Sequence, residues 1–225
     1  MSAAVSSSLT EGIVMTPVPT LPLEPFSPAA SLSICVFCGA RSGAEEDVAA
    51  ARELGTLIGR AGHRLIYGGG GSGLMGEVAW AAYDSGADVM GIIPAFLYER
   101  ERGIAAPPQE RFLTPTMAAR KERMLACADV FLALPGGYGT LDEIFEVLSL
   151  NYLGLHAKPM VLLDVGQRWR GLLQLNTDIV HNGFADAPAD NLFRTVDTPS
   201  AALKTIEALT AGLPVFAAEP ERVTR

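Results

Sequence analysis

The stretch Val130–Leu150 constrains the fold most, because an apolar run, a glycine-rich turn and a second apolar segment follow one another there. Val130–Leu134 has the length and composition of a buried strand. Pro135-Gly136-Gly137 ends that run, and Thr140 with Glu143 three residues later fits the start of a helix closed by a capping box. Such a strand, turn and helix start form an anion-binding site, since free N–H groups and the positive helix end meet there.

From Ser33 onward, predicted strands alternate with predicted helices, which indicates an α/β fold with a doubly wound parallel sheet in a single domain. Ligands of such sheets bind beyond the carboxyl ends of the strands, where the glycine-rich turns lie. Pro94–Pro115 is expected to be a long irregular connection. The other strands are expected at Ile34–Phe37, Arg64–Tyr67, Asp88–Ile93, Pro159–Asp164 and Phe193–Val196. Helices are expected at Glu45–Ala61, Met117–Ala128, Trp169–His181 and Ser200–Ala211, and a further helix opens at the turn Gly68–Gly76 and runs to about Ser85.

The two ends of the chain differ in composition from its middle. Residues 1–31 are rich in Ser and Pro and are expected to be a disordered tail, and residues 214–225 a flexible C-terminal tail, which leaves one domain over 32–213. The N-terminal segment has no basic region followed by a long apolar run. We therefore expect no secretion signal, no membrane span and a cytoplasmic location.

The net charge of −8 argues against a general nucleic-acid surface, so an anionic ligand must be held by a local basic cluster. The three cysteines suggest no disulfide framework. Cys35-x-x-Cys38 is compatible with a redox pair or half of a zinc site, but two buried strand thiols are the favoured interpretation, because no second pair accompanies it. The histidines show no metal-ligand spacing, and no metal site is predicted.

Two further features bear on function. Gly68–Gly76 is a second glycine-rich turn; it lacks the Lys-Ser/Thr of a P-loop, and both a weak dinucleotide motif and tight strand-to-helix packing remain open. Arg120, Lys121 and Arg123 fall in the first two turns of a predicted helix, where cations oppose the helix dipole. Either these residues form a solvated helix face or, as we favour, an anion offsets their charge.

Together these motifs carry a resemblance. Pro135–Glu143 reads PGGYGTLDE and Tyr67–Gly76 reads YGGGGSGLMG, and with Arg120-Lys121 they resemble the LONELY GUY family of cytokinin riboside 5′-monophosphate phosphoribohydrolases, long mislabelled as lysine decarboxylases. The resemblance covers about residues 33–211. It implies a Rossmann-like fold, a homodimer, no metal or organic cofactor, and hydrolysis of the N-glycosidic bond of a nucleoside 5′-monophosphate, such as N6-substituted AMP, to free base and ribose 5-phosphate.

The resemblance also implies roles for individual residues. Arg120 and Glu143 match the catalytic positions, although the residues alone leave Glu143 equally suited to a capping box. The implied substrate-binding residues are Gly70, Gly73, Met75, Glu101, Lys121, Gly136, Gly137, Tyr138, Gly139, Thr140, Leu141, Asp142 and Ser149.

Two alternatives to this function stay open. One is a nucleosidase that accepts a broader range of purine or pyrimidine monophosphates, and the other is a non-catalytic carrier of a nucleotide or of the molybdenum cofactor on the same fold. Lysine decarboxylation is disfavoured, because it needs a Schiff-base lysine and a pyridoxal phosphate site, and no lysine here has a recognisable setting for that.

Overall fold

The computed structural model describes residues 31–186 and 192–211. Apart from Ser31, the two tails expected at 1–31 and 214–225 lie outside the described residues. Within the described ranges, no helix is both long enough and apolar enough to cross a bilayer.

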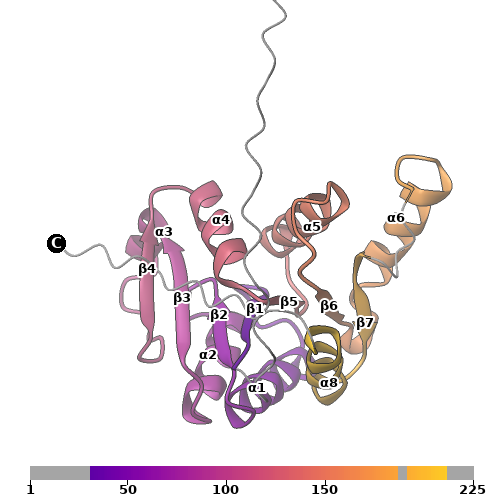
Figure 1. Cartoon of the computed structure of the whole chain (residues 1–225). Coiled ribbons are helices and arrows are strands. Elements are labelled where there is room, and N and C mark those ends of the chain that lie inside the picture. Colours follow the sequence, from indigo (N-terminus) through magenta and orange to yellow (C-terminus); the bar gives the residue numbers. More distant parts are fainter. Residues whose placement is uncertain (1–30, 187–191, 212–225) are drawn as a thin grey trace, which may run out of the picture.

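Seven strands form one parallel sheet in the order β4-β3-β2-β1-β5-β6-β7 (Figure 1). The predicted doubly wound sheet is therefore confirmed, and each predicted strand is present to within one residue. The strands are β1 (Ser33–Phe37), β2 (Arg64–Tyr67), β3 (Val89–Pro94), β4 (Glu110–Thr114), β5 (Val130–Ala133), β6 (Met160–Leu163) and β7 (Arg194–Val196).

Helices cover both faces of the sheet (Figure 1). One face carries α1 (Glu45–Arg60), α2 (Gly73–Asp84) and α8 (Pro199–Thr210), and the other carries α4 (Met117–Cys127), α5 (Tyr138–Tyr152) and α6 (Arg170–His181). The short helix α3 (Ala95–Arg100) follows β3, and a 3₁₀ turn η1 (Val165–Gln167) follows β6.

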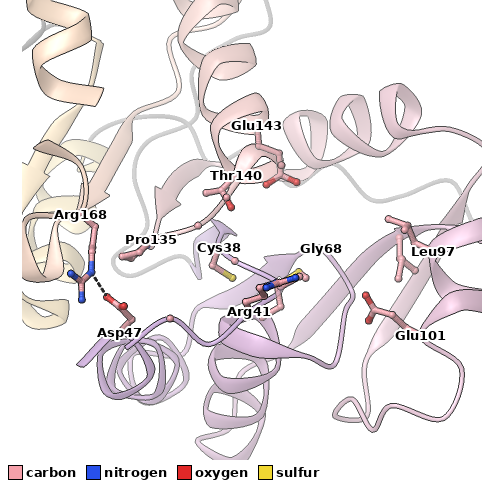
Figure 2. A pocket seen from close by; sticks show the side chains of 18 of the residues that line it. Cys38, Arg41, Asp47, Gly68, Leu97, Glu101, Pro135, Thr140, Glu143 and Arg168 are labelled. Atoms are coloured by element: carbon pink, nitrogen blue, oxygen red, sulfur yellow. Dashed lines mark hydrogen bonds and ion pairs between the residues drawn. The ribbon is translucent and has the colours of Figure 1, made fainter. Parts of the chain in front are cut away.

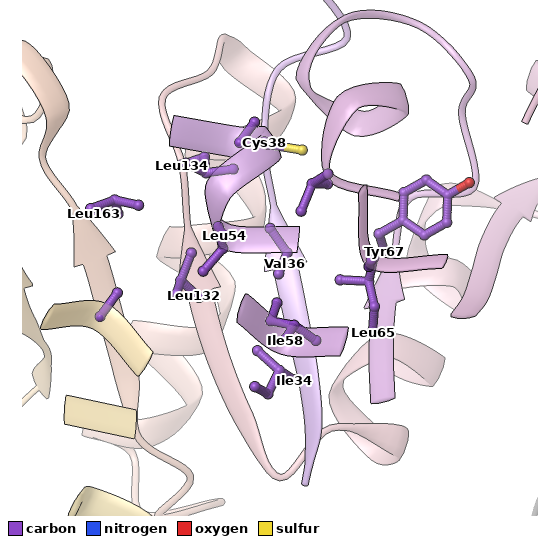
Figure 3. Close-up of a cluster of buried hydrophobic side chains, with 14 of the residues drawn as sticks. Ile34, Val36, Cys38, Leu54, Ile58, Leu65, Tyr67, Leu132, Leu134 and Leu163 are labelled. Carbon is purple, nitrogen blue, oxygen red and sulfur yellow. The ribbon is translucent and has the colours of Figure 1, made fainter. Parts of the chain in front are cut away.

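Because both faces are covered, the central strands are buried throughout, which explains why they read as continuous apolar runs. Figure 3 shows the core on the α1 side, where Leu54 and Ile58 of α1 pack onto Ile34 and Val36 of β1. All four of these side chains are 1% exposed or less. On the other face, residues of α4, α5 and α6 form a second buried cluster with β1, β5 and β6.

The prediction for Pro94–Pro115 is wrong, because that segment contains α3 and the edge strand β4. β4 runs parallel to β3, with Met90 beside Glu110 and Pro94 beside Thr114. Its sequence, ERFLT, mixes charged and apolar residues and is largely exposed, since an edge strand has a neighbour on one side only. The apolar run that identifies the inner strands is therefore missing here.

A glycine in α1 sets how closely α1 approaches α2. A Cβ built on Gly55 would lie 2.9 Å from both the Cβ of Ala81 and the backbone N of Ala82, and closer still to the carbonyl oxygen of Val78. Backbone atoms cannot move aside as a flexible side chain can, so the two helices would have to separate.

We therefore expect Gly55→Ala to lower the free energy of unfolding by about 1–3 kcal/mol, the cost of overpacking a close contact. Urea unfolding monitored by circular dichroism measures the loss. Gly171→Ala is the matched control, because a Cβ there meets nothing within 4 Å, and helix propensity predicts a gain of up to about 1 kcal/mol. Equal stability of the wild type and Gly55→Ala would contradict the packing argument.

Candidate active site

A cleft of about 880 Å³ lies at the carboxyl edge of the sheet (Figure 2). Its walls come from the turns after β1, β2, β3, β5 and β6 and from the starts of α4 and α5. From β1 the chain builds β2, β3 and β4 on one side of the sheet and then returns to add β5 on the other side of β1. The cleft lies at this switch point, where doubly wound sheets bind ligands.

The start of α5 forms one wall, and it differs from the prediction. The N-cap is Gly137, in an extended conformation with φ −96° and ψ −153°, so Thr140 is the third residue of the helix. The first hydrogen bond of the helix runs from Leu141 N to Gly137 O at 3.0 Å. The predicted Thr140–Glu143 capping box is therefore wrong: the cap residue has no side chain, and Thr140 instead packs against the Cα of Gly136.

This early start leaves the N–H groups of Tyr138, Gly139 and Thr140 without intrahelical acceptors, since the first N–H groups of a helix have no carbonyl to bind. Gly136, Gly137, Gly139 and Thr140 all line the cleft. The predicted anion-binding turn is thus present, and its helix begins three residues earlier than expected.

Arg120 of α4 and Glu143 of α5 meet at the centre of the cleft. Their side chains are 3.3 Å apart, from Nη2 to Oε1, and the two residues are only 7% and 6% exposed. Arg120 Nε also donates to the carbonyl oxygen of Ile92 at 3.1 Å. A Cβ on Gly68 would lie 3.3 Å from Cζ of Arg120 and closer to Nη2, so the glycine-rich turn after β2 makes room for the guanidinium.

Burial raises the pKa of the Glu143 carboxyl from 4.5 to about 7. The Arg120 guanidinium opposes this shift, because a nearby positive charge favours the ionised form, and Asp142 adds to it. Glu143 therefore titrates close to neutral pH, as groups that exchange protons during catalysis do.

Lys121 does not line the cleft, although it follows Arg120 directly. Its ammonium binds Asp142 at 2.9 Å and Glu146 at 2.5 Å, both on α5. The anions that offset the cations at the start of α4 are thus carboxylates of the protein itself. Arg123 packs its guanidinium over the ring of Phe112, 4.0 Å from the centroid.

The turn after β2 and the end of α3 supply further predicted residues. Glu101 lines the cleft and accepts a hydrogen bond from Gly71 N at 3.2 Å, and Met75 lines it too. Gly70 faces Glu101, since a Cβ there would lie 2.9 Å from Oε2. Gly73, with φ +57°, instead packs against the backbone of the turn after β1. The glycines of this turn serve close packing, one of the two interpretations left open.

Besides Gly70, Gly73 and Lys121, four more predicted substrate-binding residues do not line the cleft. Tyr138 is 93% exposed, and Asp142 is exposed on the side facing Lys121. Leu141 packs against the second hydrophobic cluster. Ser149 is exposed, about three turns along α5 from the helix start.

Sequence similarity identifies the family. The sequence family described as "Possible lysine decarboxylase" matches residues 75–206. A probable cytokinin riboside 5′-monophosphate phosphoribohydrolase of Oryza sativa subsp. japonica is 42% identical over 166 residues, 73% of this chain and 72% of the relative. A cytokinin riboside 5′-monophosphate phosphoribohydrolase of Arabidopsis thaliana is 39% identical over 175 residues, 77% and 81% of the two chains. The chain belongs to the LONELY GUY family.

Solved structures similar to this LONELY GUY family member include proteins that carry or bind the molybdenum cofactor. The molybdenum cofactor carrier protein of Chlamydomonas reinhardtii has a TM-score of 0.63 at 22% identity, covering 82% of this chain and 100% of that one. The molybdenum cofactor binding protein of Rippkaea orientalis gives 0.62 at 21%, covering 80% and 98%. At these identities the likeness shows the shared Rossmann-like fold alone.

The family resemblance did not indicate four other residues that line the cleft. Arg41 and Asp47 come from the segment after β1, and Arg168 and Trp169 from the segment after β6. Arg168 binds Glu46 at 2.5 Å and Asp47 at 3.3 Å, which joins η1 to the start of α1 (Figure 2). Their position after the carboxyl ends of two strands is the signal that could have pointed to them.

The cysteine prediction is confirmed, because Cys35 and Cys38 are both buried and free. Burial raises the pKa of each thiol, which keeps both protonated at neutral pH. In the described part of the chain, no three His, Cys, Asp or Glu residues lie close enough together to hold a metal ion.

The raised pKa of Glu143 predicts how the free energy of unfolding depends on pH. Between pH 4.5 and about 7 the folded protein keeps a proton on Glu143 that the unfolded chain has released. Rising pH therefore removes stability over this interval, and the loss ends above the folded pKa. From the size of the shift, we expect a loss of roughly 3 kcal/mol.

The measurement is the free energy of unfolding of the wild type and of Glu143→Gln, from urea titrations at several pH values between 4 and 8. Groups common to both proteins cancel in the difference. We expect the stability of the wild type relative to Glu143→Gln to fall as the pH rises. A difference that does not change with pH would show that Glu143 has an ordinary pKa.

Proposed function

We propose that this protein hydrolyses the N-glycosidic bond of nucleoside 5′-monophosphates, with N6-substituted AMP as the preferred class, to a free base and ribose 5-phosphate. The observation that carries the proposal is the buried Arg120–Glu143 pair in a cleft beside the uncapped start of α5. The names of the relatives, which are 38–42% identical, support the same reaction.

The start of α5 is the place for the 5′-phosphate. Three N–H groups without intrahelical acceptors converge there, and the helix dipole adds a positive potential. Gly137 and Gly139 leave the approach open, since a Cβ on either would meet nothing within 4 Å. Fixing the phosphate at this point holds the ribose within reach of Glu143, one turn further along the helix.

Cleavage of the C1′–N bond leaves its electron pair on the base and creates an oxocarbenium-like sugar. A carboxylate at Glu143 stabilises this positive charge, holds a ribose hydroxyl or takes a proton from the water that adds to C1′. The departing base takes up a proton, so the products are the neutral base and ribose 5-phosphate. Each of these roles requires Glu143 to be ionised.

Arg120 keeps that ionised form accessible. Its guanidinium lies against Glu143 and opposes the rise in pKa that burial causes. Because Arg120 also binds the carbonyl of Ile92, its fork is held in one orientation and in turn orients the carboxylate. We therefore assign Arg120 to the orientation and charge of Glu143 and to the departure of the base.

The side chains of the cleft do not suit lysine decarboxylation. The chain has three lysines, Lys121, Lys158 and Lys204, and none of them lines the cleft. Lys121 is bound by two carboxylates, and Lys158 donates to the carbonyl oxygens of Leu125 and Ala126 at the end of α4. No amine is thus placed to form a Schiff base with a ligand in the cleft.

Base release from AMP, N6-substituted AMP, other nucleoside monophosphates and the matching nucleosides tests the function. We expect release from the nucleotides and not from the nucleosides, since the start of α5 needs a phosphate to bind. Glu143→Gln serves as the catalytic control, with a turnover reduced at least about 100-fold, the low end for losing a general base.

Substrate binding by Glu143→Gln should fall much less than turnover, because the turn that holds the phosphate is unchanged. Comparable turnover of adenosine and AMP would overturn the proposal. Binding of nucleotides without any base release would favour the carrier alternative.

We also propose a homodimer that forms through α5 and the loop after it. Phe145, Ser149 and Tyr152 share one exposed face of α5, and Leu153 and Leu155 beyond it are 65% and 69% exposed. Apolar groups gathered in this way mark an interaction surface. This placement also gives Ser149 a position on the dimer face and away from the cleft.

We expect light scattering to give twice the chain mass of 23.7 kDa at micromolar concentrations. Leu153→Glu combined with Leu155→Glu places two charges on the proposed face and should shift the mass toward the monomer. A wild-type mass near 23.7 kDa throughout would contradict the dimer.

A further inference from the structure

Four arginines line the cleft, and they differ in whether a carboxylate already binds them. Arg120 is paired with Glu143, and Arg168 with Glu46 and Asp47. The side chains of Arg41 and Arg100 make no hydrogen bond or ion pair with any described residue. Glu101 is the carboxylate of the cleft lining that has no ion-pair partner among the described residues, so two unpaired cations against one unpaired anion leave a net positive charge where a ligand binds, in a chain whose net charge is −8.

We propose that Arg41 binds the 5′-phosphate opposite the start of α5 and thereby sets the preference for nucleotides over nucleosides. This inference rests on the proposed function, because it names the side chain that holds the phosphate of that substrate. The sequence and the family resemblance placed this charge on Arg120 and Lys121, but both of these cations are neutralised by carboxylates of α5.

The backbone of the turn after β1 is fixed beside the start of α5. Gly39 N donates to the carbonyl oxygen of Pro135 at 3.1 Å, and a Cβ on Gly39 would lie 3.4 Å from the Cα of Gly136. On its other side, Met75 N donates to the carbonyl oxygen of Gly39 at 3.4 Å. Arg41 thus extends from a held backbone, two residues beyond the contact with the turn that precedes α5.

The side chain of Arg41 reaches into the middle of the cleft. Figure 2 shows it between Cys38 and Glu101, below Thr140 and Glu143. A planar guanidinium with several donors matches phosphate oxygens in pairs, which a single lysine ammonium does not. The N–H groups of α5 and the fork of Arg41 would then bind the phosphate from two sides.

Arg100 is a less suitable candidate for the phosphate. It belongs to α3, and Figure 2 shows Leu97 of the same helix at the end of the cleft away from Thr140. The lining on that side includes the apolar side chains of Ile93, Leu97 and Met117. Such a lining suits a flat base better than a dianion.

The test compares Arg41→Gln, Arg41→Lys and Arg100→Gln with the wild type. For Arg41→Gln we expect the KM for AMP to rise about 10- to 100-fold, the range for losing a charge-assisted pair of hydrogen bonds. At a pH well above the pKa of about 7 for Glu143, where this carboxyl is ionised in both proteins, kcat should stay within about 3-fold. Arg41→Lys should restore part of the loss. Arg60→Gln removes the same charge from the exposed last turn of α1 and should leave the kinetics unchanged.

Product inhibition shows which part of the substrate Arg41 contacts. The inhibition constant of ribose 5-phosphate should rise in Arg41→Gln by the same factor as the KM, and that of adenine should not change. The assignment of Arg41 would be overturned if the inhibition constant of adenine rose equally or if that of ribose 5-phosphate did not change. It would also be overturned if Arg100→Gln raised the KM for AMP more than Arg41→Gln does.

Direct titration of ribose 5-phosphate separates this inference from the proposed function. If the wild type releases no base yet binds ribose 5-phosphate, and Arg41→Gln loses that binding, the function fails and the role of Arg41 stands. If the wild type hydrolyses AMP and Arg41→Gln matches it in all constants, the function stands and the role of Arg41 fails. Wild-type protein that binds no ribose 5-phosphate contradicts both.

Discussion

The buried pair of Arg120 and Glu143 is the interaction on which the geometry of the cleft depends. Arg120 and Glu143 are each less than a tenth exposed, and burying two charges costs free energy. Removing one partner would leave the other as an unpaired buried charge. The pair joins α4 to α5, and the bond from Arg120 to Ile92 joins both to β3. The pair also requires glycine at position 68, because a side chain on Gly68 would displace the guanidinium of Arg120.

The sheet was largely predictable from the sequence, whereas its edge and the start of α5 were not. Inner strands such as Arg64–Tyr67 are buried on both faces and therefore read as apolar runs. β4 has a single neighbouring strand and is largely exposed, so its sequence mixes charged and apolar residues and lacks the apolar run of an inner strand. The start of α5 was misplaced because Gly137 caps the helix without a side chain, and Thr140 gave the stronger cap signal.

In the candidate site, too, the residues within sequence motifs were predictable, whereas the residues brought together only by folding were not. Arg120 and Glu143 were predicted and meet, but consecutive residues of a helix point about 100° apart, so Lys121 faces the flank of α5 when Arg120 faces the cleft. Arg41 and Arg168 were missed, because their arrival in one cleft depends on turns that are distant in sequence. Whether each of them is free or paired depends on where Glu46 and Asp47 lie after folding.

The charges of the cleft are coupled in a way that connects Arg41 with the chemistry at Glu143. Glu143 titrates near neutral pH, so a phosphate dianion bound nearby would raise its pKa further and protonate the carboxyl that the reaction needs. A guanidinium against that phosphate cancels most of this effect. In the proposed reaction, the oxocarbenium charge would then form beside an ionised Glu143, and the attraction would grow as the C1′–N bond breaks. Such an arrangement stabilises the transition state more than the bound substrate, which is the condition for catalysis.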